Sequence, residues 1–338
     1  MKKITTAYVG IATLIGFSSL GGGAVAQPSS ADSVSNYPDR PVTIVSWSPA
    51  GGPIDILART IAHGLSELWN EKVLVENRTG ATGVIATQHV ARATPDGYTL
   101  LITTSTAHIA NLYLQPSLSY NPKTDFEPVA RLAAGSVVLM APANAPFNDI
   151  DGLIKYAREQ GKEMSYGTWG IGSSAHLYGE LLKTRYNVPL VHVPYRGDVG
   201  STQDLVGGTL PISFTGGVTA KRLIDAGQAK ALAIASAQRF SALPNVPTFK
   251  EQGYEGFDLM GWAGIFVPAG TPQPIIEKLS KDLEKVVKSP EVSKRLLDIG
   301  QDEIYMDHAA MKVWLESEFE NWGKLIKDSG VDKLVEKK

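Results

Sequence analysis

The chain has 338 residues, a formal net charge of −2 and no cysteine. This length exceeds what one hydrophobic core usually serves and indicates two domains. The mild acidity argues against a general nucleic-acid binder. A chain without cysteine forms no disulfides and carries no lipid on cysteine, so the fold must rest on its hydrophobic core.

The first 26 residues have the three parts of a secretory signal peptide. Lys2 and Lys3 give a basic start, residues 8–20 are apolar but broken by Gly and Ser, and residues 24–26 (Ala-Val-Ala) form a cleavage site. The apolar run is shorter than the roughly 20 residues of a membrane span. Cleavage would remove two Lys and no acid, taking the net charge from −2 to −4. We therefore expect a periplasmic protein with a disordered lead-in over residues 27–36.

Residues 47–59 predict a strand end, a glycine loop and a helix start. Residues 42–45 are β-branched, and after Pro53 apolar residues recur at helical spacing. The small residues 50–52 (Ala-Gly-Gly) let a ligand approach the backbone. Free N–H groups and the positive end of the helix dipole would favour an anion there. For an isolated loop of this kind, a plain turn between strand and helix is the more common interpretation.

Strand and helix patterns then alternate, which predicts a parallel sheet with helices on its faces. The expected elements are a strand at 73–76, a glycine loop at 78–83, a helix at 84–93 and strands at 98–102 and 137–141. Ligands of such sheets lie beyond the carboxyl ends of the strands. Thr104 and Ser105, which follow the strand at 98–102, should therefore share a rim with residues 50–52.

A second strand, glycine loop and helix begin beyond a Pro-rich break at 142–146. The expected elements are helices at 153–159, 177–182, 202–205 and 221–226 and strands at 164–166, 191–195, 212–214, 231–235 and 261–268. From residue 272 the chain is helical, Asp307 can cap the last helix, and this tail should brace the first domain. We assign 37–140 plus 263–338 to the first domain and 141–262 to the second.

An ordered set of motifs resembles the Bug proteins, the periplasmic solute-binding proteins of tripartite tricarboxylate transporters. Each motif is weak alone, but the set is specific and covers essentially the whole mature chain. The motifs are Tyr37-Pro38-Asp39-Arg40-Pro41, Pro49-Ala50-Gly51-Gly52 with Asp55 and Arg59, Val75-Glu76-Asn77-Arg78, Pro95-Asp96-Gly97-Tyr98, Gly172-Ser173-Ser174 with His176, His192-Val193-Pro194-Tyr195, and Trp262 with Pro268-Ala269-Gly270-Thr271-Pro272.

The resemblance implies a periplasmic-binding-protein fold, in which two α/β domains joined by two crossing strands close a cleft on a small carboxylate. It implies that the carboxylate lies in the loop of residues 50–52, commonly with ordered waters, and that residues 172–174 face it from the second domain. It also implies a membrane permease as partner. Ser46-Trp47-Ser48, Pro53 and Trp169 depart from the family pattern and bear on which ligand is bound.

Several candidate residues have both a ligand-binding and a structural interpretation. Trp47 and Trp169 could be flat walls for an aromatic carboxylate such as terephthalate or could be ordinary packing, and aliphatic di- and tricarboxylates remain open. Asp55 could cap its helix or accept a hydrogen bond from the ligand. His176 could donate to a ligand oxygen or be buried, and Asp198 could meet the ligand or pair with Arg196. The candidate ligand-binding residues are Trp47, Ser48, Ala50, Gly51, Gly52, Asp55, Thr104, Ser105, Trp169, Gly172, Ser173, Ser174, His176 and Asp198.

Enzymatic interpretations have less support. There is no G-x-S-x-G elbow, no H-E-x-x-H and no P-loop, and the six His have no metal-ligand spacing. Ser174 and His176 are two positions apart on one helix and do not face each other. We therefore expect a monomeric solute-binding protein without cofactor, metal or nucleic acid. The alternatives are a ligand sensor that presents the carboxylate to a membrane receptor and, less favoured, an exported hydrolase.

Overall fold

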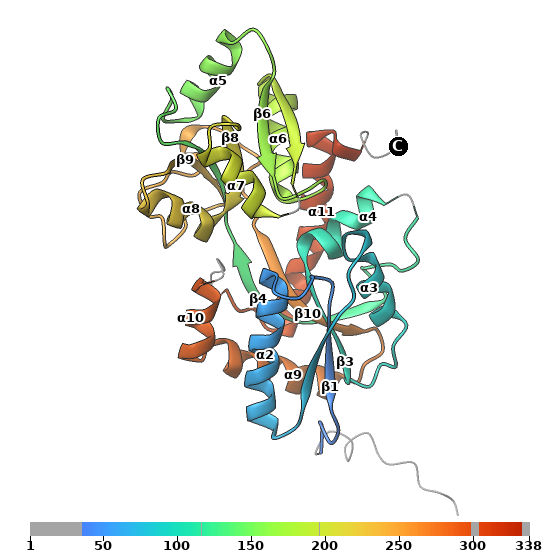
Figure 1. The fold of residues 1–338 in the computed structure, drawn as a ribbon. Coiled ribbons are helices and arrows are strands. Elements are labelled where there is room, and N and C mark those ends of the chain that lie inside the picture. Colours follow the sequence, from blue (N-terminus) through green and yellow to red (C-terminus); the bar gives the residue numbers. More distant parts are fainter. Residues whose placement is uncertain (1–35, 116, 196, 299–303, 333–338) are drawn as a thin grey trace, which may run out of the picture. The chain divides into compact units, whose positions relative to one another are not determined.

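Two five-stranded sheets form the framework of the computed structural model (Figure 1). The structure describes residues 36–115, 117–195, 197–298 and 304–332, and from Tyr37 onward these residues belong to one compact unit. The expected signal peptide, and all but the last residue of the expected lead-in, lie outside the described residues.

The first sheet has the order β2-β1-β3-β10-β4. Its strands are β1 (Val42–Ser46), β2 (Val73–Asn77), β3 (Thr99–Thr104), β4 (Phe126–Gly135) and β10 (Gly261–Pro268). Strand β1 is parallel to β2 and β3, but β10 is antiparallel to both β3 and β4. The prediction of a parallel sheet is therefore right only for the β-α-β part. The returning strand β10 enters between β3 and β4 in the opposite direction, a pairing that no local pattern specifies.

Helices connect the strands of this sheet and pack against it. They are α2 (Pro53–Trp69), η1 (Ala81–Gly83), α3 (Val84–Ala91), η2 (Thr106–Ala110), α4 (Asn111–Leu114), α9 (Gln273–Val287) and α10 (Pro290–Asp298). The predicted stripe on α2 is buried at Leu57, Ile61 and Leu65. A Cβ at Gly64 would lie 2.6 Å from Val286 Cγ1, so the glycine lets α2 and α9 cross closely.

The second sheet has the order β7-β6-β8-β5-β9. Its strands are β5 (Val137–Pro142), β6 (Met164–Thr168), β7 (Leu190–Pro194), β8 (Ile212–Gly216) and β9 (Ala229–Ala235). Strand β6 is parallel to β7 and β8, whereas β5 is antiparallel to β8 and β9. The pairing of β5 with this sheet moves residues 137–140 out of the first sheet, where the sequence-based division placed them. Only Ser136 separates β4 from β5, so neither composition nor a turn signal marks the change of sheet.

The second sheet carries α5 (Ile150–Glu159), α6 (Ser174–Tyr186), α7 (Asp198–Val206), α8 (Gly217–Asp225) and the short η3 (Lys250–Gln252). Each of α6, α7 and α8 follows the carboxyl end of a parallel strand. Both halves of the described chain are thus α/β domains of the alternating kind that the sequence predicts.

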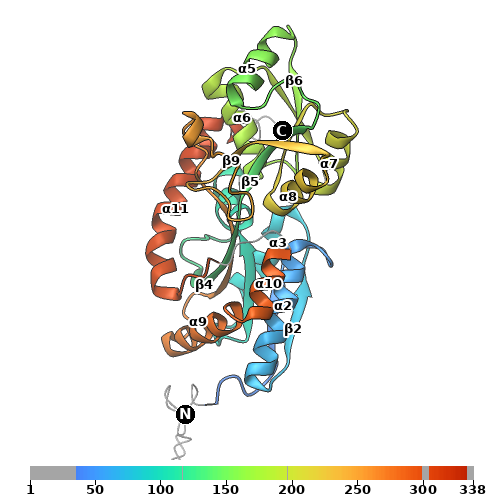
Figure 2. The ribbon, with the colours of Figure 1, turned by 90° about the vertical axis from the view of Figure 1, so that its left-hand side faces the viewer.

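The last helix, α11 (His308–Ser329), contacts both halves of the molecule (Figure 2). It packs against β4 and against α6, and Thr184 on α6 donates a hydrogen bond to Asp328 O (3.0 Å). Helix α11 therefore packs on the first domain, as expected for the helical tail, and in addition on the second. Its inner face is apolar along its full length, with Met311, Phe319 and Ile326 all buried, so it reaches beyond one sheet.

Candidate ligand-binding site

The loops after β1 and β3 leave the first sheet at the same edge. The two strands are parallel neighbours, with Ser46 opposite Ile102. The loop that starts at Trp47 and the residues that follow Ile102 therefore leave neighbouring strands side by side. Thr104 Oγ1 accepts the Ala107 N–H (3.4 Å) and the following Ser105 is buried, so both belong to the start of η2.

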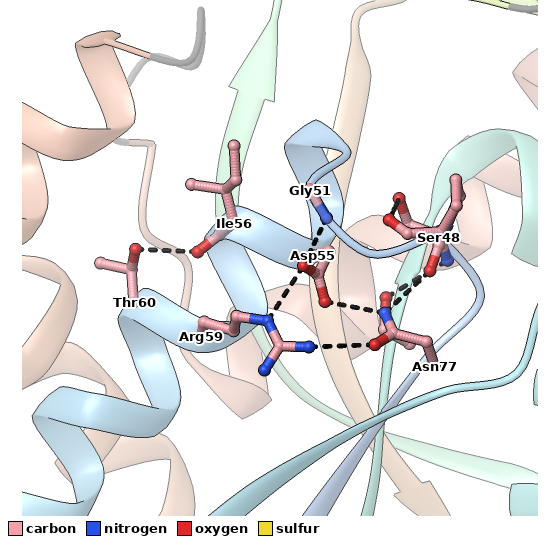
Figure 3. A network of polar contacts seen from close by, with 9 residues as sticks. Ser48, Gly51, Asp55, Ile56, Arg59, Thr60 and Asn77 are labelled. Carbon is pink, nitrogen blue, oxygen red and sulfur yellow. Dashed lines mark hydrogen bonds and ion pairs between the residues drawn. The ribbon is translucent and has the colours of Figure 1, made fainter.

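The first glycine loop is occupied by a carboxylate of the protein itself (Figure 3). Gly51 adopts φ +80°, which turns its N–H towards α2, where it donates to Asp55 Oδ2 (2.8 Å). Gly52 N–H donates to Pro49 O (3.1 Å). The expectation that these two N–H groups are free is therefore wrong. Among the described residues, the first-turn N–H groups of Ile54 and Asp55 find no acceptor, as is usual where a helix begins.

Asp55 is the centre of a network that also holds Arg59 and Asn77. Its carboxylate accepts Asn77 Nδ2 (2.7 Å) and Arg59 Nε (3.0 Å) as well as the Gly51 N–H, and Arg59 Nη2 donates to Asn77 Oδ1 (3.0 Å). Burial by itself raises the pKa of Asp55, but the hydrogen bonds from Arg59, Gly51 and Asn77 outweigh it and hold the pKa below its ordinary value. The Asp55 carboxylate thus has a structural role, in which it holds the loop and the start of α2 together. The sequence did not single out Asn77, since it lies 22 positions further along the chain.

Trp47 is half-buried and lies against the glycine that precedes α3. A Cβ at Gly83 would come within 3.3 Å of Trp47 Cγ. The indole N–H is buried and meets no hydrogen-bond acceptor in the described part of the chain. Ser48 is buried as well, and its carbonyl accepts Asn77 Nδ2 (2.8 Å) while its hydroxyl donates to Pro49 O (3.2 Å). The side chain of Ser48 therefore shapes the loop.

The second glycine loop, residues 169–173, turns on Gly170 and Gly172, whose φ angles are +136° and +76°. Ser173 caps α6, since its Oγ accepts the His176 N–H (3.2 Å) and donates to Gly170 O (2.6 Å). The first turn of α6 contains no acidic residue. Among the described residues, the N–H groups of Ser174 and Ala175 and the Ser174 hydroxyl have no hydrogen-bond partner. Beyond the Ser173 cap, this helix start therefore has no negatively charged side chain to offset its dipole.

His176 lies beneath the second loop. Its Nδ1 accepts the Gly172 N–H (3.2 Å), and its ring stacks on that of His192 with centroids 4.0 Å apart. Burial, with smaller effects of His192 and Lys183, lowers the pKa of His176 to about 3, so the ring is neutral. The ring is thus buried and its Nδ1 is bonded within the protein, while the role of a donor to a ligand oxygen stays a prediction. Trp169, next to this loop, is half-buried and packs against the main hydrophobic cluster, as does Trp47.

The second loop contacts the first domain. A Cβ at Gly172 would lie 3.0 Å from Leu114 Cδ1 on α4, and α4 continues η2, which begins directly after Ser105. Gly172 and Leu114 are therefore neighbours, although they belong to different halves of the described chain.

Asp198 joins two elements of the second domain. Its carboxylate accepts the Thr215 hydroxyl, with both oxygens at 2.6 Å, and the Gly216 N–H (3.2 Å). Burial raises the pKa of Asp198, and the hydrogen bonds from Thr215, Thr219 and Gly216 partly offset this. These bonds link the start of α7 to the end of β8. Arg196, its other suggested partner, lies outside the described residues.

Comparison with known proteins identifies the class of molecule. Residues 57–331 match the family model described as "Tripartite tricarboxylate transporter family receptor". The chain belongs to this receptor family. A protein in the tcbD-tcbE intergenic region of Pseudomonas sp. (strain P51) is 37% identical over 86% of this chain and 86% of its own length. BugT of Bordetella pertussis is 31% identical over 90% of this chain and 93% of its own.

Solved structures of similar receptors cover nearly the same residues. The periplasmic binding protein BugD is 33% identical, with a TM-score of 0.74 over 87% of this chain and 99% of its own. An R. palustris protein with adipate is 33% identical, with a TM-score of 0.77 over 87% of this chain and 98% of its own. MatC from Rhodopseudomonas palustris with bound malate is 31% identical, with a TM-score of 0.73 over 86% and 100%. The fold and the motif-based family assignment are thereby confirmed.

The Ser174/His176 pair that the hydrolase alternative invokes is not formed in the described part of the receptor. The Ser174 hydroxyl contacts no histidine, and the Nδ1 of His176 is bound to the Gly172 N–H. No group of three or more His, Asp and Glu within the described ranges is placed to bind a metal ion. Over the same ranges, no helix combines the length and apolarity that crossing a membrane requires.

Proposed function

We propose that this receptor captures a small carboxylate in the periplasm and delivers it to a tripartite membrane transporter. The observation that carries the proposal is the start of α6, where two N–H groups and the Ser174 hydroxyl have no partner within the described chain and no acidic side chain neutralises the helix dipole. Helix starts of this kind favour anions. The adipate and malate bound by similar receptors are small dicarboxylates.

The charged group of the ligand is assigned to α6 rather than to residues 50–52. At α2 the Gly51 and Gly52 N–H groups are used, and Asp55 already places a carboxylate in the first turn. A second anion there would meet like charge, whereas α6 offers unopposed donors. The N–H groups of Ile54 and Asp55 remain for a neutral or water-bridged oxygen at the ligand's other end.

The energies of these contacts suffice for a useful affinity. A hydrogen bond to a charged acceptor contributes about 1.5 to 3 kcal/mol. Three such bonds at α6 and two weaker ones at α2 approach the roughly −8 kcal/mol of micromolar binding once ordering costs are subtracted. No arginine is required for recognition.

We further propose that the body of the ligand lies between Trp47 and Trp169, which favours an aromatic acid such as terephthalate. Both indoles are half-buried at loops that follow carboxyl ends of strands, β1 and β6 respectively. Ring stacking adds about 0.5 to 1.5 kcal/mol beyond burial. Trp169→Leu should then weaken terephthalate more than adipate. Equal loss for both acids, measured by calorimetry, would remove the aromatic assignment.

Titration calorimetry with adipate, malate, citrate and terephthalate tests the function, and the diamide of adipic acid serves as the uncharged control. At 100 times its Kd, a ligand raises stability by about 2.7 kcal/mol, which a thermal-shift screen detects first. Binding of a diacid without binding of the diamide is the expected result. If no carboxylate binds the parent protein, the proposal is wrong.

Ser174→Asp tests the assignment to α6. The new carboxylate suits the first turn of a helix and should repel the ligand and weaken binding at least tenfold; because Ser174 is only 4% exposed, thermal unfolding of the variant checks that it folds. Ala309→Asp adds the same charge to the first turn of α11, at an exposed position, and should leave affinity unchanged. Unchanged affinity in Ser174→Asp would refute the assignment. Delivery is tested by deleting the gene in its own bacterium, which should abolish uptake of the carboxylate identified.

A further inference from the structure

A stack of three rings, of which Tyr166 and His176 are buried and His192 is half-buried, underlies the second glycine loop. His176 from α6 stacks on His192 from β7 (centroids 4.0 Å apart), and His192 stacks on Tyr166 from β6 (5.1 Å). Tyr166 in turn donates its hydroxyl proton to Glu180 Oε1 (2.8 Å). His176 and Glu180 are 3% and 6% exposed, so these groups are fixed by packing from three elements.

The two histidines hold opposite ends of the loop. His176 Nδ1 accepts the N–H of Gly172 (3.2 Å). His192 Nε2 contacts Thr168 Oγ1 (2.6 Å), and the same oxygen accepts the N–H of Gly170 (3.2 Å). Gly170 and Gly172 have positive φ angles, and this part of the backbone belongs to neither a sheet nor a helix. The side chains therefore supply the support that a sheet or helix would otherwise give.

The bond to Gly172 requires a particular form of His176. A nitrogen that accepts an N–H carries no proton, so the ring proton must be on Nε2. Gly172 is close in sequence to the helix start: the cap Ser173 follows it, and then come Ser174 and Ala175, whose N–H groups are unpaired among the described residues. Holding Gly172 thus sets the direction in which those donors point.

We infer that His176 is a positioning residue for ligand capture, which fixes the second glycine loop through its Nδ1 and its stack on His192 without touching the ligand. The inference rests on the proposed function, because it deepens the account of the α6 donors. A donor role of the Nε2–H towards the ligand is compatible with the Gly172 bond, but it predicts equal loss of affinity when either Asn or Phe replaces His176.

Two substitutions separate the acceptor from the ring. His176→Asn places an amide oxygen near the position of Nδ1 and keeps an acceptor for Gly172, whereas His176→Phe keeps the stacking ring and removes the acceptor. The first readout is hydrogen exchange at the Gly172 amide in the ligand-free protein. We expect about tenfold faster exchange in the Phe variant and near-parental exchange in the Asn variant.

The second readout is the Kd for the carboxylate that binds best, which should rise about tenfold in His176→Phe and less than threefold in His176→Asn. Equal losses in both variants, or unchanged Gly172 exchange in His176→Phe, would overturn the inference. Should the parent bind no carboxylate, the proposed function fails, but the exchange experiment still decides whether His176 holds the loop.

The parent protein provides a measurement that does not depend on any variant folding. Nitrogen-15 NMR of the His176 ring distinguishes the two neutral tautomers, and the structure predicts the proton on Nε2. Thr168→Val should speed exchange at Gly170 but not at Gly172, because it removes only the other anchor. A proton on Nδ1 of His176, or release of both amides together by Thr168→Val, would contradict the assignment.

Discussion

At the scale of single residues, Asp55 determines what the first glycine loop can bind. Its carboxylate satisfies Gly51, and the bond forms only because Gly51 adopts φ +80° and turns its N–H back towards the helix. The sequence predicts the strand, the loop and the helix at this point. It does not predict the backbone angle of one glycine, on which the availability of the N–H depends.

Asp55→Ala should lower the free energy of unfolding by about 1 to 3 kcal/mol, because it leaves Gly51, Asn77 and Arg59 without their shared acceptor. Chemical denaturation measures the change. The control is Asp225→Ala, which breaks an ion pair with Lys221. Because the Asp225 side chain is 60% exposed, this substitution should lower the free energy of unfolding by less than about 1 kcal/mol. If the two variants lose equal stability, the Asp55 network is no more than a surface contact.

His108 should make the protein less stable in acid. Its ring is buried, 1% exposed, and stacks on Phe266 at 4.1 Å, and burial lowers its pKa from 6.5 to about 3. The unfolded chain therefore binds a proton at a pH where the folded chain does not, so this stability is present above pH 6.5 and is lost as the pH falls towards 3. Between pH 7 and pH 5 the loss is about 2 kcal/mol.

His108→Phe tests this linkage, because it keeps an aromatic ring against Phe266 and removes the titrating group. Urea unfolding at several pH values should show a shallower fall in stability between pH 7 and pH 5 than in the parent. His176 and His192, whose pKa values burial lowers to about 3 and about 4, still contribute to the remaining slope. An identical slope in parent and variant would show that His108 is protonated in the folded protein.

At the scale of elements, prediction succeeded where the signal is local. Asp307 was expected to cap the last helix, and its side chain accepts the Ala310 N–H (2.8 Å) at the start of α11. Strand β4 was missed. It contains Arg131 and also Pro128, which lacks an N–H, so its sequence does not look like a strand. The sheet accommodates Pro128 because β4 is an edge strand. Strand β5 was found, but its sheet was not, because pairing partners distant in sequence leave no local pattern.

Removal of the α11 cap should cost about 1 kcal/mol. Asp307→Ala leaves the Ala310 N–H without its acceptor, whereas Asp307→Asn keeps a side-chain oxygen at the same place. Thermal unfolding should therefore rank the parent and the Asn variant together and the Ala variant below them. If the Asn variant is as unstable as the Ala variant, the negative charge at the helix start matters more than the hydrogen bond.

At the scale of the whole molecule, one buried cluster contains side chains from both sheets, such as Leu101 on β3 and Phe214 on β8. Helix α11 is part of it through Trp322, which is fully buried and donates to Glu318 Oε2 (3.2 Å), the same oxygen that accepts Trp262 Nε1 (3.1 Å) from β10. The apolar stripe of α11 is visible in the sequence. Its contact with α6 is not, because it depends on where the chain changes sheets.

Trp322→Ala should therefore destabilise both domains together, by about 3 to 5 kcal/mol, rather than the first domain alone. Val313→Ala on the same helix, at a side chain 72% exposed, is the matched control and should change stability by less than about 0.5 kcal/mol. Hydrogen exchange resolves the two domains, because amides of β1 report on the first sheet and amides of β6 on the second. Loss of protection in β1 with β6 unchanged would mean that α11 stabilises only the first sheet. Equal loss in both would establish that the helix couples the two halves of the described chain.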